Sequence, residues 1–122
     1  MRGGDRQGVG LWGEDRAAAF LEERGYTVLA RRFRVREGEL DLVASGHGYL
    51  CFVEVKLRKD DSMGEAREYV TLSKQRKVRT AALRYLAAHP TRLQPRFDVV
   101  EVYAPQGTKT KEPIIRHWEN AF

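Results

Sequence analysis

The run LCFVEVKLR, residues 50–58, constrains the fold of this 122-residue chain more than any other feature. Its composition is typical of a buried β-strand, but a carboxylate and an ammonium group, Glu54 and Lys56, interrupt it. Because side chains alternate along a strand, Glu54 and Lys56 share one face with Phe52. A charge that is taken out of water is normally paired or bound to a metal ion, because its desolvation is costly. The run therefore predicts a strand of a covered sheet that carries a charged site.

The rest of the chain predicts one sheet and two helices, in the order α-β-β-β-α-β-β. Alternating runs separated by turn signals are typical of strands. One helical pattern ends at Gly25, and the other ends before Pro90 and is suited to capping by Thr71 or Ser73. We expect strands at residues 26–35, 39–44, 49–57, 97–103 and 114–118, and helices at residues 14–24 and 73–88. This order predicts the α/β class, here an α+β mixed sheet with helices packed against it.

Other segments predict less regular structure. Residues 1–13 are glycine-rich and polar, which predicts a flexible N-terminal arm before a single domain at residues 14–122. Within this arm, Gly8, Gly10 and Gly13 have the spacing of a dinucleotide-binding loop. No hydrophobic strand precedes them, so we reject that interpretation. Polar loops are expected at residues 60–69 and 105–113.

Composition excludes several classes of protein. The single cysteine, Cys51, rules out an internal disulfide and a cysteine-based zinc site, and its hydrophobic neighbours predict a buried, inert thiol. No apolar run approaches the roughly 20 residues that a membrane span needs. The N-terminus lacks the apolar core of a signal peptide. These features predict a cytoplasmic protein that does not enter a membrane.

The positive charge is clustered. The net charge is +5 and the pI is near 9.6. Such clusters favour a polyanionic partner, most often nucleic acid, but a solvated basic surface would have the same composition. The two clusters are Arg31, Arg32, Arg34 and Arg36, and Lys74, Arg76, Lys77 and Arg79.

A second strand contributes further charges. In residues 39–44, Glu39 and Asp41 share a face with Val43, and Leu40, Leu42 and Ala44 lie opposite. If this strand neighbours residues 49–57, then Asp41, Glu54 and Lys56 converge on one side of the sheet. Two carboxylates with a lysine suit Mg²⁺ or Mn²⁺ and phosphate chemistry. Two alternatives stay open, a structural Glu54–Lys56 ion pair and an exposed sheet face.

Each predicted helix also places a charged residue on its inward side. Glu14 shares the apolar stripe of Ala17, Ala18 and Leu21, which predicts that it faces the sheet. A glutamate in the first turn would alternatively complement the helix dipole. In the second helix, Lys74 begins the inward column and would reach the rim of a site. The other cations there, Arg76, Lys77 and Arg79, are expected to meet solvent or phosphate.

These residues together resemble the YraN family. The resemblance covers about residues 8–103, and the pair GELDLV and FVEVKLR (residues 38–43 and 52–58) is its most specific part. It also includes Glu14, Lys74 and the run RFDVV at residues 96–100. The resemblance implies a restriction-endonuclease-like core within the PD-(D/E)xK nuclease superfamily, similar to archaeal Holliday-junction resolvases.

The resemblance also implies roles for individual residues. Asp41 and Glu54 would be metal ligands for Mg²⁺ or Mn²⁺, Lys56 would position or polarise the attacking water, and Glu14 would be an accessory acid. Arg32 stands where the family usually has asparagine in its RNxR stretch. We take Glu39 and Lys74 as further accessory residues. The expected nucleic-acid-binding residues are Arg31, Arg32, Arg34, Arg36, Arg58, Arg76, Lys77 and Arg79.

The leading functional hypothesis is a metal-dependent endonuclease that hydrolyses phosphodiester bonds in DNA, including branched or repair intermediates. The alternative is a non-catalytic nucleic-acid-binding module with a vestigial nuclease site. A third interpretation, a basic partner-binding protein with a structural ion network, is the least favoured of the three. Cleavage of both strands of a duplex would favour a homodimer.

Overall fold

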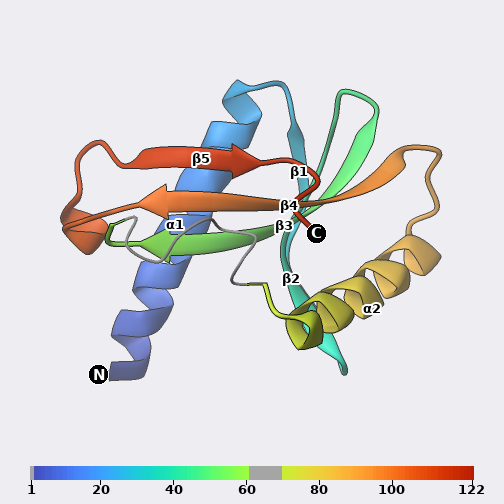
Figure 1. Ribbon diagram of the computed structural model, residues 1–122, viewed down its shortest axis with the longest axis horizontal. Helices are drawn as coiled ribbons and strands as arrows, with labels where there is room; N and C mark the ends of the chain where they lie inside the picture. The colour runs from blue at the N-terminus through green and yellow to red at the C-terminus, as the bar shows by residue number, and fades with distance from the viewer. Residues whose placement is uncertain (1, 61–69) are drawn as a thin grey trace.

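The computed structural model of the chain describes residues 2–60 and 70–122, with side chains from residue 10 onward. The predicted order of helices and strands is confirmed (Figure 1). The elements are α1 (Arg2–Glu23), β1 (Thr27–Val35), β2 (Gly38–Gly46), β3 (Tyr49–Arg58), α2 (Leu72–Ala88), β4 (Gln94–Tyr103), the short 3₁₀ helix η2 (Gly107–Lys109) and β5 (Ile114–Trp118).

The strands form one mixed sheet in the order β1-β2-β3-β4-β5. β3 and β4 are parallel, and the other neighbouring strands are antiparallel. A parallel pair needs a long crossover connection, and α2 lies within the one that joins β3 to β4. The predicted fold class is therefore confirmed, with an order of elements compatible with a nuclease-like α+β fold.

The two helices cover opposite faces of the sheet. Ala17, Ala18 and Leu21 of α1 pack in one buried cluster with Leu42 and Val53. The other cluster joins α2 to the opposite face, where it contains Val78, Ala82, Tyr85, Val43 and Phe52. Figure 1 shows α1 crossing behind β3, β4 and β5, whereas the first turn of α2 lies beside the tip of the β1–β2 hairpin. Charges on the α2 side of β3 are consequently near the start of this helix.

Helix α1 is longer than the sequence pattern predicts. It begins at Arg2 rather than at residue 14, in the segment expected to be a loose arm. Two of the glycines that suggested an arm lie against the sheet, because an added Cβ would be 3.4 Å from Leu57 at Gly13 and 3.4 Å from Arg32 at Gly10. An added Cβ would make ordinary van der Waals contact at both positions, so the glycines do not prevent the helix from packing there, and no proline precedes Pro90 to stop it. The division into arm and domain stays a prediction.

The alternation of β2 is broken at Asp41. The sequence pattern predicts that Leu40, Leu42 and Ala44 share a face, and this is wrong for Leu40, which joins the α2 cluster. Opposite this point on β1, Arg32 has a positive φ of 51°. The backbone of the hairpin is thus irregular at the position where the charged residues meet.

Other predictions concern single elements. Thr71 caps α2 by accepting a hydrogen bond from the N–H of Lys74. Cys51 is buried, and burial raises the pKa of its thiol to about 12, so the thiol is inert as predicted. Within the described residues, no helix has the length and apolar character to cross a bilayer. The polar loop expected at residues 60–69 lies, apart from Asp60, outside the described residues.

Candidate functional site

The candidate site lies at a fork in the sheet, where β2 leaves β3. Paired residues run from Gly46 opposite Tyr49 to Leu42 opposite Val53. Before Leu42, β2 continues beside β1 into the hairpin tip, which turns away from β3 (Figure 1). Asp41 is the first residue on the open side of this fork. Its Oδ2 accepts a hydrogen bond of 2.8 Å from the backbone N–H of Val55, so the carboxylate takes over a backbone group that β2 no longer pairs.

Glu54 lies beside this position on β3, and its side chain is only 3% exposed. One carboxylate oxygen, Oε1, is 3.4 Å from Nζ of Lys74 at the start of α2. The other oxygen, Oε2, is buried and has no hydrogen-bond partner among the residues that the structure describes. A buried carboxylate oxygen without a donor is unfavourable, because its desolvation is not compensated. Its environment is suited to a cation.

The two carboxylates are close enough to perturb each other. Burial raises the pKa of Glu54 to about 7, and the negative charge of Asp41 adds to this shift while Lys74 and Lys56 oppose it. Burial also raises the pKa of Asp41 against the effect of the Val55 N–H bond. Carboxylates that share one site and have raised pKa values are typical of functional clusters.

The lysine that pairs with Glu54 is not the one that the ion-pair alternative assumed. That alternative paired Glu54 with Lys56 on its own strand, but the salt bridge comes from Lys74 of α2. The side chain of Lys74 is 42% exposed and therefore links the buried carboxylate to solvent. Lys56 is half-buried on the same sheet face as Glu54. The site thus combines two carboxylates from adjacent strands with one lysine from β3 and one from α2.

The accessory acids are held by arginines. Glu14 is 6% exposed, which confirms that it faces inward, and both its oxygens accept from Nε of Arg32, at 3.0 and 3.2 Å. Its charge contributes to the raised pKa of Asp41. Glu39 accepts a hydrogen bond of 2.6 Å from Nε of Arg34. Both acids therefore lie beside the fork, and each is already paired with an arginine.

The donor set fits a hard divalent cation that keeps most of its water. Among the described residues, no three histidine, cysteine or acidic side chains gather closely enough to hold a metal ion alone. Mg²⁺ is commonly bound through one or two carboxylates plus water and substrate phosphate. Asp41 and Glu54 provide that pair, and the partnerless Oε2 of Glu54 provides an oxygen ligand. The residues present are therefore compatible with Mg²⁺ or Mn²⁺.

The predicted nucleic-acid-binding cations fall into two groups. Those of the first group bind carboxylates or aromatic rings: Arg31 pairs with Asp15, Arg32 with Glu14, Arg34 with Glu39 and Arg58 with Glu101, while Arg79 lies over the ring of Phe97. The second group, Arg36, Arg76 and Lys77, is exposed around the hairpin tip and the start of α2. A cleft of about 390 Å³ lies between these elements, lined by residues 34–39 with Lys74 and Lys77. Its basic rim adjoins the fork.

One buried acid near the site was not predicted from the sequence. Glu101 of β4 is fully buried and accepts hydrogen bonds from Nε of Arg58, Nε1 of Trp118 and the hydroxyl of Tyr103, at 3.2, 2.7 and 3.3 Å. It lies opposite Lys56 in the β3–β4 register. The signal was present, because VEV at residues 100–102 repeats the pattern of VEV at residues 53–55.

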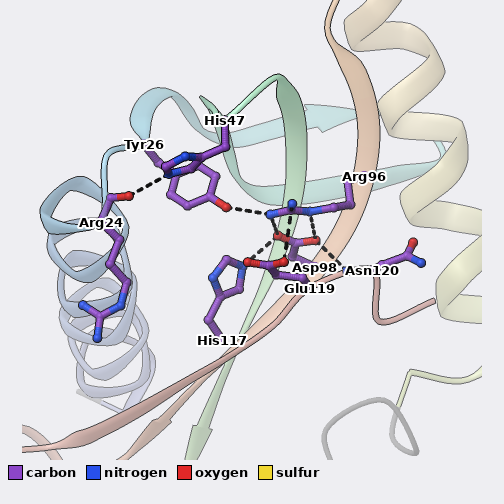
Figure 2. Close-up of polar contacts among 8 residues, drawn as sticks. All are labelled: Arg24, Tyr26, His47, Arg96, Asp98, His117, Glu119 and Asn120. Atoms are coloured by element: carbon purple, nitrogen blue, oxygen red, sulfur yellow. Dashed lines mark hydrogen bonds and ion pairs between the residues drawn. The ribbon is translucent and has the colours of Figure 1, made fainter.

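A second buried network lies on the α1 side of the sheet and has a structural role (Figure 2). Asp98 accepts two hydrogen bonds of 2.9 Å from Arg96, lies 2.7 Å from Nε2 of His117 and accepts the N–H of Asn120. Arg96 also donates to the hydroxyl of Tyr26. Burial opposes ionisation of Asp98, but the bonds from His117 and Arg96 hold its pKa below its usual value. The network ties β5 and the residues after it to β4.

Fold and site define a class of protein, a mixed α/β domain with an acidic pair at a fork in its sheet. Residues 13–102 match the family described as Uncharacterised protein family UPF0102. The chain belongs to this family, UPF0102 (YraN), which confirms the resemblance seen in the sequence.

Similar proteins cover almost the whole chain. A UPF0102 protein of Syntrophotalea carbinolica is 43% identical over 118 residues, which are 96% of this chain and 93% of the relative. One of Nocardia farcinica is 41% identical over 122 residues, 99% and 94% of the two chains. One of Lachnoclostridium phytofermentans is 46% identical over 115 residues, 93% and 91% of the two chains.

Proposed function

We propose that this protein is a metal-dependent endonuclease that hydrolyses phosphodiester bonds in DNA. The observation that carries the proposal is the proximity at the fork of two carboxylates, Asp41 and Glu54, of which the Oε2 of Glu54 is buried without a hydrogen-bond donor in the described part of the chain. Asp41 and Glu54 would hold Mg²⁺ or Mn²⁺. The chemistry that such an ion supplies when bound is neutralisation of phosphate charge and a lowered pKa of a coordinated water.

The residues of the chain have distinct parts in this reaction. The water oxygen forms a bond to phosphorus, the bond from phosphorus to one sugar oxygen breaks, and that oxygen takes up the proton that the water loses. Lys56, on the face of Glu54, positions the water or the phosphate by donating a hydrogen bond. Lys74, whose side chain is 42% exposed, neutralises the phosphate from the α2 side. Phosphates further along the strand bind the exposed cations Arg36 and Lys77.

A cleavage screen tests this proposal. Labelled linear, nicked, flap and four-way DNA are incubated with the protein and Mg²⁺ or Mn²⁺, and the products are resolved on a denaturing gel. We expect cleavage of at least one substrate by the wild type and none by Asp41→Asn or Glu54→Gln. Glu22→Gln, which removes an exposed acid from α1, is the matched control and should cleave normally. Equal cleavage by wild type and Asp41→Asn would overturn the proposal, as would a wild type that is inactive on all substrates.

One observation favours the second candidate, a nucleic-acid-binding module with a vestigial site. Lys74 already provides a positive charge 3.4 Å from Glu54, so the acidic pair is partly neutralised without a metal ion. Calorimetric titration with Mn²⁺ separates the two functions. The nuclease requires a binding signal that disappears in Asp41→Asn, whereas the module binds DNA equally well with and without Mn²⁺.

A further inference from the structure

The sheet face that bears Glu54 and Lys56 continues across β4 and β5. Residues that pair in neighbouring strands project to the same side of a sheet. The registers of β3, β4 and β5 therefore define three rows on this face. The rows are Glu54, Val99 and Trp118; Lys56, Glu101 and Arg116; and Arg58, Tyr103 and Ile114. The first two rows begin with residues of the candidate site, so this surface is continuous with it.

Glu101 holds three side chains of this face in place. It is fully buried, and its carboxylate accepts hydrogen bonds from Arg58, Tyr103 and Trp118. Each bond removes freedom from a side chain that would otherwise rotate. The rings of Tyr103 and Trp118 and the guanidinium of Arg58 are consequently oriented before any ligand arrives, which lowers the entropic cost of binding.

The outer edge of this face is exposed and combines aromatic, cationic and apolar groups. The guanidinium of Arg116 lies 5.2 Å from the ring centre of Tyr103, and Arg116 is itself exposed. Ile114, which pairs with Tyr103 across the strands, is 65% exposed. A nucleobase can stack on a guanidinium plane or on an aromatic ring, and the cation also attracts the adjacent phosphate.

We propose that this surface, formed by Tyr103, Arg116, Ile114 and Trp118 around Glu101, binds a single-stranded segment of DNA that leads to the cleavage site. The inference rests on the proposed nuclease function for the direction of the strand, but the binding surface is testable without cleavage. A single strand is favoured over a duplex, because stacking on protein side chains requires bases that are not stacked in a double helix. The preferred substrates are thus DNAs with an unpaired end or flap.

Binding measured in EDTA tests the surface independently of catalysis. Fluorescence anisotropy follows a labelled 15-nucleotide oligo(dT) and a labelled 15-base-pair duplex at one fixed salt concentration. We expect Tyr103→Leu and Arg116→Ala each to weaken oligo(dT) binding about tenfold, which lies within the range for loss of one stacking side chain. Both should change duplex binding by less than about twofold. Thermal melts confirm that both variants fold.

The opposite side of the sheet provides matched controls. Tyr49→Leu removes a tyrosine that also lies under an arginine, Arg96, and Arg24→Ala removes an arginine that lies over Phe20 of α1. Both should bind oligo(dT) like the wild type. The surface is overturned if wild type does not bind oligo(dT), if all four variants bind alike, or if Tyr103→Leu and Arg116→Ala weaken duplex binding equally. Oligo(dT) binding that depends on Tyr103 and Arg116, without any DNA cleavage, would uphold the surface and reject the nuclease function.

Discussion

Oδ2 of Asp41 lies 2.8 Å from the backbone nitrogen of Val55 and accepts its hydrogen bond across the fork of the sheet. This bond anchors a carboxylate at the point where β2 stops pairing with β3. The same side chain therefore has two functions that substitutions can separate, acceptance of a backbone hydrogen bond and provision of negative charge.

Asp41→Asn should remove the charge and keep the bond. An asparagine oxygen can still accept from Val55, and the repulsion between Asp41 and its acidic neighbours Glu54 and Glu14 disappears. We expect stability in urea equal to or above that of the wild type at neutral pH. Asp41→Ala is the matched control, since it leaves the Val55 N–H without its acceptor and should cost about 1–3 kcal/mol. Equal stability of the Ala and Asn variants would contradict the structural role of this bond.

Divalent metal should stabilise the wild type and not its site variants. A ligand that binds only the folded state raises the melting temperature by mass action. We expect a melting temperature that rises with Mg²⁺ or Mn²⁺ concentration in the wild type, and a much smaller rise in Asp41→Asn and Glu54→Gln. An identical rise in all three proteins would show that the ions bind elsewhere.

The alternating patterns were sufficient to predict the strands and the sheet face that carries Glu54 and Lys56. Periodicity failed to predict the partner of Glu54 and the face of Leu40, because both depend on three-dimensional packing. Residues two apart on a strand are separated by about 7 Å, so Lys56 is poorly placed to pair with Glu54, and the nearer lysine arrives from α2. Leu40 lies on the α2 side of the sheet rather than on the predicted face, because the hairpin backbone is irregular at Arg32 and Asp41. Neither effect has a signal in local sequence.

The acidic partners of the arginines could not be predicted from the sequence either, because each ion pair joins elements that are distant in sequence. Arg32 and Glu14 meet only because α1 packs beside β1, and Arg58 meets Glu101 across the β3–β4 pair. The family resemblance indicated which acids form the candidate site, but not which cations are paired with acids. The homodimer and the cytoplasmic location stay predictions.

Several arginines that the sequence assigned to DNA binding are paired with acids, so the expected DNA-binding surface is now centred on the cations that are unpaired within the described residues. We expect replacement of Arg36, Arg76 and Lys77 by alanine to weaken DNA binding and to reduce the slope of log K against log salt by about 0.9 for each phosphate group that is no longer bound. The control replaces Arg31, Arg34 and Arg84, which pair with Asp15, Glu39 and Glu37. It removes the same charge and should change the slope less. Identical slopes for the two triple variants would argue against a distinct basic rim.

Gly38 allows the hairpin tip to approach α2 closely. A Cβ at this position would lie 2.6 Å from the carbonyl oxygen of Lys77, so Gly38→Ala must push the hairpin and helix apart. We expect a loss of about 1–3 kcal/mol in unfolding free energy and weaker metal-induced stabilisation, because Lys74 and Asp41 move relative to each other. Gly10→Ala is the control, since its Cβ would meet only the end of the Arg32 side chain at 3.4 Å and alanine favours the helix.

Glu54 should make stability depend on pH in an unusual direction. Its pKa is about 7 in the folded protein against an ordinary value of 4.5, so the folded state binds this proton more tightly than the unfolded state does. Protonated Glu54 therefore contributes its full stabilisation below pH 4.5. This contribution, about 3 kcal/mol of unfolding free energy, disappears as the pH rises to about 7. Asp98, whose pKa is lowered, acts in the opposite sense, because its contribution disappears as the pH falls.

The difference in unfolding free energy between wild type and Glu54→Gln isolates this contribution, since Asp98 is present in both proteins. Urea titrations from about pH 4 to pH 8, without divalent metal, should show the wild type losing stability relative to the variant across this interval. At the upper end the variant should be at least as stable, because Lys74 is 42% exposed and its ammonium can reach water once the carboxylate is gone. If the variant is instead about 3–5 kcal/mol less stable there, the loss expected for a broken buried ion pair, then Glu54 stabilises the fold through Lys74 and is not a strained ligand.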